Sequence, residues 1–120
     1  MSEQPRDLKV RTKEFALRII RMCSKLPKAD TVAQVLGKQV LRSGTSVGAN
    51  YREASRGRSK AEFISKIGDS LKEIEETEYW LELLVESGCL SARTMSDLLD
   101  ETRQLIAIFT TIDKNSKRNL

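Results

Sequence analysis

The sequence contains no histidine, and it is poor in other residues that build catalytic or metal sites. Without histidine, a histidine general base, a Ser-His-Asp triad and the Glu-x-x-His pattern of di-iron bundles are excluded. The two cysteines, Cys23 and Cys89, match no zinc-ligand spacing. They fall near one end of the predicted fold, where a disulfide could form, but a cytosolic chain favours reduced, buried thiols. We therefore expect no enzyme activity, no cofactor and no metal.

Prolines, glycines and long apolar runs are also scarce. The 120 residues include two prolines and six glycines, with 39% hydrophobic and 32% charged residues, which favours a soluble helical protein. No apolar run approaches the roughly 20 residues of a membrane-spanning helix, and the N-terminal MSEQPRDLKV lacks the apolar core of a signal peptide. We expect one domain, residues 1–120, in the cytoplasm.

Apolar residues recur at helical spacing in four segments, separated by short connections that contain proline, glycine or serine. The expected helices are approximately residues 7–25, 31–56, 60–87 and 92–113. Gly57 is expected to end the second helix in the left-handed conformation, and Gly88 is the expected C-terminal stop of the third helix. The second and third helices are expected to be the longest, and the tail after residue 113 to be frayed. Short connections make neighbours antiparallel, which predicts an all-α up-down-up-down antiparallel four-helix bundle.

The segment from Leu41 to Gly57 keeps helical periodicity but carries small and polar residues where a bundle usually has leucine. Small residues permit close approach of helices, and an inward Asn50 would set the register. Arg42 is level with Glu73 across the predicted hairpin, which predicts an ion pair or, alternatively, two solvated charges. Arg42, Asn50 and Glu73 are thus the expected structural polar network.

Charge is distributed unevenly along the chain. Residues 1–60 contain 14 Lys and Arg against 5 acids, and residues 61–120 contain 7 against 12. A basic half suits either phosphate or an acidic surface of another subunit. The candidate nucleic-acid-binding residues are Arg11, Arg18, Arg21, Arg52, Arg56, Arg58 and Lys60. Tyr51 is expected to offer a ring for base stacking, and the alternative for the whole set is ordinary solubilising charge.

The acidic series in the third predicted helix suggests a second alternative. Glu73-x-x-Glu76 followed by Asp97-x-x-Asp100 resembles the carboxylate pattern of all-α magnesium-dependent nucleotide pyrophosphatases. The predicted register displaces Asp97 from Glu73 by roughly 13 Å at the helical rise, so the four carboxylates would not converge. This enzyme reading is the weakest of the alternatives.

Several polar motifs, in their order along the chain, resemble those of the bacterial four-helix bundle protein family. Members of this family include proteins encoded in intervening sequences of 23S ribosomal RNA genes. The resemblance spans roughly residues 36–92. The matching motifs are Arg42-Ser43-Gly44-Thr45-Ser46, Gly48-Ala49-Asn50, Arg52-Glu53-Ala54, Leu71-Lys72-Glu73 and Glu76-Thr77-Glu78-Tyr79-Trp80-Leu81.

That resemblance implies a compact bundle that assembles as a ring-shaped homopentamer. The family is similar to the accessory protein of diversity-generating retroelements, a basic pentamer that binds nucleic acid and a reverse transcriptase. For this chain it implies a non-catalytic, RNA- or DNA-associated homo-oligomer, with a reverse transcriptase as a further candidate partner. The main alternative is a protein-protein interaction module that binds no nucleic acid.

Overall fold

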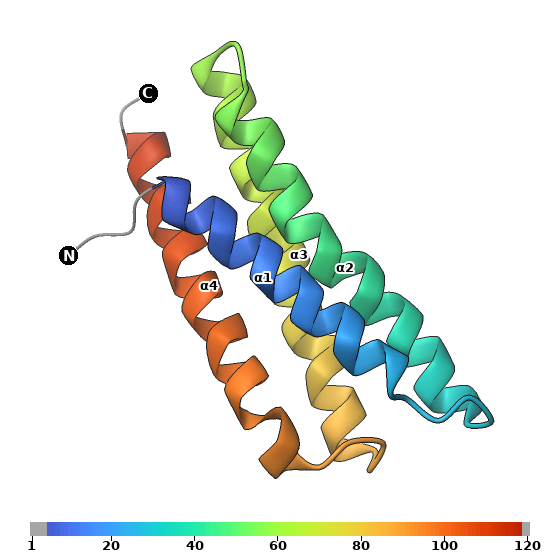
Figure 1. Ribbon diagram of the computed structural model, residues 1–120. Coiled ribbons are helices and arrows are strands. Elements are labelled where there is room, and N and C mark those ends of the chain that lie inside the picture. The colour runs from blue at the N-terminus through green and yellow to red at the C-terminus, as the bar shows by residue number, and fades with distance from the viewer. Residues whose placement is uncertain (1–4, 119–120) are drawn as a thin grey trace.

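The protein is a bundle of four helices, seen here in a computed structural model that describes the backbone of residues 5–118 and the side chains of residues 8–118. The helices are α1 (Pro5–Ser24), α2 (Thr31–Ser55), α3 (Lys60–Glu86) and α4 (Ala92–Arg118). Consecutive helices run antiparallel (Figure 1), and residues 5–118 contain no strand. The predicted up-down-up-down all-α bundle is confirmed.

Helix starts follow the capping residues of the sequence. Asp30 Oδ1 accepts a hydrogen bond of 3.0 Å from the Ala33 amide and begins α2. Ser59 Oγ accepts one of 3.1 Å from the Glu62 amide and begins α3. Glu62 Oε1 accepts in return from the Arg58 amide at 2.6 Å, one residue before the cap. The amides of Glu62 and Arg58 are therefore both hydrogen-bonded. In the usual capping box the glutamate would accept from the amide of the cap residue itself, Ser59, rather than from that of Arg58.

The two glycines expected at helix ends differ in backbone conformation. The left-handed conformation expected at Gly57 is absent, because its φ is not positive, whereas Gly88 at the end of α3 has a φ of 87°. A Cβ at Gly57 would lie 3.1 Å from the Ala54 carbonyl oxygen. The tight turn after α2 therefore needs a residue without a side chain, because space is short there rather than because the backbone is left-handed.

The prediction that the last helix ends near residue 113 is wrong, because α4 continues to Arg118. An ion pair of 3.1 Å joins Lys117 to Asp113 one turn earlier and supports the extension. Helices α3 and α4 both have 27 residues, and α2 has 25. The expectation that the second and third helices are the longest is therefore wrong, because α4 is longer than α2.

Three glycines of α2 allow α1 to pack closely on it. A Cβ at Gly37 would lie 2.8 Å from Leu26, and one at Gly44 would lie 2.9 Å from Ile19. A Cβ at Gly48 would lie 3.1 Å from Thr12. The three contacting residues are seven positions apart, two of them in α1 (Thr12 and Ile19) and one just after its end (Leu26), so one side of this segment rests on the glycines of α2.

The core contains polar residues beside the apolar ones. Five Ser and Thr side chains are at most 1% exposed, and they are Thr12, Ser43, Ser70, Thr77 and Thr102. Thr12 and Thr102 bond to carbonyls of their own helices, at 2.8 and 2.7 Å. The other three connect α2 to α3, which places the polar layer of the core between these two helices.

Helix α1 crosses the bundle obliquely. It lies near α4 at its own N-terminal end and diverges from α4 towards Ser24 (Figure 1). The α2–α3 turn extends beyond the outer ends of α1 and α4 (Figure 1). None of the four described helices is both long and apolar enough to span a membrane.

Candidate nucleic-acid interface

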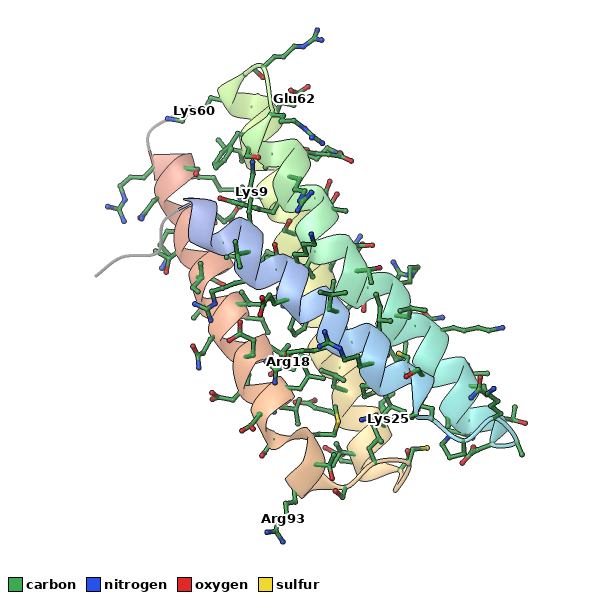
Figure 2. The ribbon with its side chains drawn as sticks, viewed as in Figure 1. Lys9, Arg18, Lys25, Lys60, Glu62 and Arg93 are labelled. Atoms are coloured by element: carbon green, nitrogen blue, oxygen red, sulfur yellow. The ribbon has the colours of Figure 1, made fainter. Side chains whose placement is uncertain are left out.

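The α2–α3 turn carries four exposed cations, which we call the tip cluster: Arg52, Arg56, Arg58 and Lys60. Arg52 lies in the last turn of α2, and Arg56 is the C-cap of that helix. Arg58 lies in the turn, and Lys60 begins α3. Because the turn extends beyond the other helices, the cluster occupies one end of the molecule, where Figure 2 shows Lys60.

The two acids nearest the tip cluster are already engaged. Glu53 lies 2.7 Å from Lys66, and the hydrogen bond from Lys66 lowers the pKa of this exposed carboxyl. Glu62 accepts the hydrogen bond from the Arg58 backbone amide. Among the described residues, no salt bridge joins a carboxylate to the guanidinium groups of the three tip arginines. The tip therefore keeps its positive charge.

Arg11 is not part of such a surface. Its Nε and Nη2 lie 3.1 and 2.8 Å from the two carboxylate oxygens of Glu101 in α4, and Nη2 is also 3.3 Å from Gln104 Oε1. The Arg11 side chain is 24% exposed. A bidentate, part-buried pair joins α1 to α4, so the geometry contradicts the prediction that Arg11 contacts phosphate.

Arg18 and Arg21 lie apart from the tip, where α1 and α4 diverge. With Lys25 they line a hollow of about 310 Å³ that has Asp97 on its α4 side. Figure 2 shows Lys60 and Glu62 at the α2–α3 end of the bundle, whereas Arg18 and Lys25 lie on α1 at increasing distance from that end. The predicted binding residues thus form two clusters on different parts of the bundle rather than one continuous flank.

Tyr51 is a core residue. It is 4% exposed, and its ring packs edge-on against Phe109 with centroids 5.9 Å apart. Burial also raises the pKa of its phenol. The prediction that Tyr51 stacks on a base is wrong, because α2 is rotated so that Tyr51 rather than Asn50 enters the core. Burying the large ring removes more apolar surface from water than burying an amide would.

Asn50 is half-buried rather than enclosed in the core. Its predicted role in setting the register is taken by two other contacts between α2 and α3. Thr77 Oγ1 and Ser43 Oγ are 2.8 Å apart, and Ser70 Oγ donates to the Val47 carbonyl at 2.9 Å. These buried bonds are satisfied in only one alignment of the two helices.

The expected contact between Arg42 and Glu73 is present. Arg42 Nη1 lies 3.3 Å from Glu73 Oε1, and Nη2 lies 3.0 Å from Glu76 Oε1. The hydrogen bond to Glu76 contributes most to the raised pKa of the Arg42 guanidinium. The Arg42 side chain is 53% exposed, so the arrangement is a surface bridge worth about 0 to 1 kcal/mol.

The acidic series of α3 is distributed over two such bridges. Glu73 and Glu76 face Arg42, while Glu78 and Glu82 lie 2.9 and 3.3 Å from Arg103 of α4. Within residues 8–118, no three Cys, Asp or Glu side chains gather closely enough to hold a metal ion. The geometry therefore gives no support to the four-carboxylate pyrophosphatase alternative.

Comparison with known proteins identifies the family. The family model for the 23S rRNA-intervening sequence protein matches residues 6–111. The chain belongs to this family. A solved structure from Bacteroides thetaiotaomicron VPI-5482, described as a protein with unknown function from the S23 ribosomal protein family, is 37% identical with a TM-score of 0.85. The match covers 92% of this chain and 97% of that chain. A search of curated proteins finds no match.

In this member of the 23S rRNA-intervening sequence protein family, the motif around Ser43 serves helix packing. Ser43 contacts Thr77 of α3, and Gly44 and Gly48 lie under Ile19 and Thr12 of α1. The unusual composition of the segment is therefore explained by contacts on both sides of α2. Ser43, Gly44 and Gly48 are buried between helices, whereas Arg42 and Ala49 of the same segment are exposed.

Sequence reasoning missed the buried Thr12, Ser70 and Thr77. Ser70 and Thr77 are seven residues apart and alternate with Ile67, Ile74, Leu81 and Leu84 in one heptad stripe. The regular spacing of these small polar residues was the available signal. Glu78 lies outside this stripe, 2.9 Å from Arg103 of α4.

Proposed function

We propose that this protein is a non-catalytic, cytoplasmic, oligomeric helical bundle that binds RNA or DNA through the phosphate backbone. The tip cluster carries the proposal. It places four cations at one end of the bundle, and the two nearby acids already have partners. Arginine offers planar, bidentate donors that suit phosphate oxygens.

The position of the cations in the fold supports this proposal. Arg58 and Lys60 lie at the N-terminus of α3, the positive end of its macrodipole, where a cation is unfavourable for the helix. The helix dipole therefore does not favour these two charges at this place. An incoming phosphate would be attracted by the side chains and by the helix end together.

Assembly would multiply this charge. The formal net charge of the chain is +4, so a homopentamer would carry about +20, which strengthens nonspecific attraction to polyanions. Several large apolar side chains of α1 and α2 are exposed, as expected of a chain that covers them with another subunit. A reverse transcriptase as protein partner stays a prediction.

Salt-dependent RNA binding tests the proposal. A labelled single-stranded RNA is titrated with the protein from about 50 to 200 mM salt, and fluorescence anisotropy gives Kd. The variant Arg56→Gln/Arg58→Gln should bind more weakly, and the slope of log affinity against log salt should fall by about 1.4, since each lost phosphate contact removes about 0.7.

The matched control is Lys28→Gln/Arg93→Gln, which removes two exposed cations elsewhere. It should leave the slope unchanged. Binding that is insensitive to salt, or an equal loss in both double variants, would contradict the proposal and favour a protein-interaction module held by apolar contacts.

A further inference from the structure

The outer surface formed by α1 and α2 exposes several large apolar side chains. Val10, Leu17 and Ile20 of α1 are 53%, 39% and 45% exposed, and Leu41 of α2 is 38% exposed. Because Ile19 rests on Gly44, the antiparallel pairing brings Ile20 close to the level of Leu41. We call these four residues and the furrow between the two helices the α1–α2 face.

Hollows along this furrow suit the side chains of another helix. One of about 240 Å³ is lined by Ala16, Gly48 and Ala49, and another of about 150 Å³ by Gly37 and Leu26. Gly48 and Gly37, which pack under Thr12 and Leu26, each line one of these hollows. Shallow holes between helices are the receptors for knobs of a packing helix.

The charges around the furrow are mainly positive. Lys9, Lys13, Lys38 and Arg52 line its hollows, against the single acid Glu14. A partner helix that fits this face must therefore present apolar or aromatic side chains flanked by carboxylates.

The chain carries such a helix surface itself. Tyr79 of α3 is 54% exposed, and Glu75, Glu82 and Glu86 lie four residues before it, three after it and seven after it. These spacings place all four on one side of α3. The Tyr79 ring also lies edge-on to Trp80, with centroids 5.1 Å apart. We call this stripe the α3 face.

We propose that the α1–α2 face of one copy of this chain binds the α3 face of a second copy, with Tyr79 seated in the glycine-lined furrow. The inference rests on the proposed self-association and assigns its surfaces. The exposed Tyr79 ring suits the apolar furrow, and the acids beside it, of which Glu82 also pairs with Arg103, are opposite in charge to the cations that line the furrow. Since the faces differ, the contact is heterologous and each copy uses both, as in a closed ring. Of the tip arginines, Arg52 lines the furrow, whereas Arg56 and Arg58 belong to neither face.

Two single variants test this assignment. Leu17→Glu places a carboxylate on the α1–α2 face, and Tyr79→Glu removes the ring from the α3 face. Both positions are exposed in the single chain, so helical content by circular dichroism should be unchanged. Light scattering should give a multi-subunit mass for the unaltered protein and a monomer mass for each variant. Ala107→Glu, an exposed change on α4, is the control and should retain the full assembly.

Mixing the two variants gives the sharper result. Each retains one intact face, so a 1:1 mixture should form a dimer with one copy of each and nothing larger. A variant that keeps the full assembly, or a mixture that stays monomeric, overturns the assignment. RNA titration of the same samples separates the two proposals. If the unaltered protein is a monomer that binds RNA, only this inference is refuted. If the protein assembles and the mixed variants form the expected dimer but no sample binds RNA, only the proposed function is refuted.

Discussion

Gly44 and Gly68 provide a matched test of the close packing between α1 and α2. Both are interior positions of helices, but a Cβ at Gly44 would lie 2.9 and 3.1 Å from the two γ carbons of Ile19, whereas one at Gly68 would meet nothing within 4 Å. Ile19 is fully buried and branched at Cβ, so it cannot turn away easily. The same substitution should therefore be less favourable at Gly44 than at Gly68.

The magnitude follows from two opposing effects. Replacing an interior helical glycine by alanine gains about 1 kcal/mol, so Gly68→Ala should raise the free energy of unfolding by about that amount. At Gly44 the gain is opposed by overpacking of about 1 to 3 kcal/mol. Gly44→Ala should therefore be about 1 to 3 kcal/mol less stable than Gly68→Ala.

Urea unfolding at one fixed protein concentration, followed by helical circular dichroism, measures the difference. The cost of Gly44→Ala should disappear when Ile19→Ala is also present, because the clashing γ carbons are then absent. If Gly44→Ala stabilises the protein as much as Gly68→Ala, the close contact does not determine how α1 packs, and the reasoning fails.

Two further predictions concern the core. Thr77→Val keeps the side-chain shape but removes the hydroxyl that lies 2.8 Å from Ser43 Oγ, so it should lower the free energy of unfolding by about 1 to 3 kcal/mol. Urea unfolding should show a smaller loss when the same change is made in a Ser43→Ala background. An equal loss in both backgrounds would contradict a hydrogen bond between the two side chains. Burial raises the pKa of Tyr51 above its ordinary 10.0, so the folded state favours the neutral phenol, and this contribution is complete below pH 10 and lost as pH rises through the higher folded value. As the pH rises from about 9 to 11, the melting temperature of Tyr51→Phe should therefore fall less than that of the unaltered protein. Parallel falls in the two proteins would refute the raised pKa of Tyr51.

Local chemistry along the chain predicted the bundle well. Apolar spacing marked the four helices, and Asp30, Ser59 and Gly88 marked helix ends that the structure confirms. These signals work because capping and periodicity depend on residues within one or two turns of each other. The short connections then leave few ways to arrange antiparallel neighbours.

The candidate site depended on contacts between residues far apart in sequence. The sequence placed Arg11 among phosphate-binding residues, but Glu101, 90 positions later, satisfies it. The Tyr51 ring appeared available for stacking until Phe109 covered it. The sequence shows that a position carries a cation or an aromatic ring. It does not show whether a residue of another helix pairs with that cation or covers that ring.

The sequence by itself determined the class, the order and most ends of the helices, because these follow from neighbours along the chain. Only the tertiary structure decided the rotation of α2, which buries Tyr51 and leaves Asn50 half-buried. It also decided which cations stay exposed at the tip. Both outcomes depend on how four helices fill one common core, where a shift of one position exchanges buried and exposed side chains.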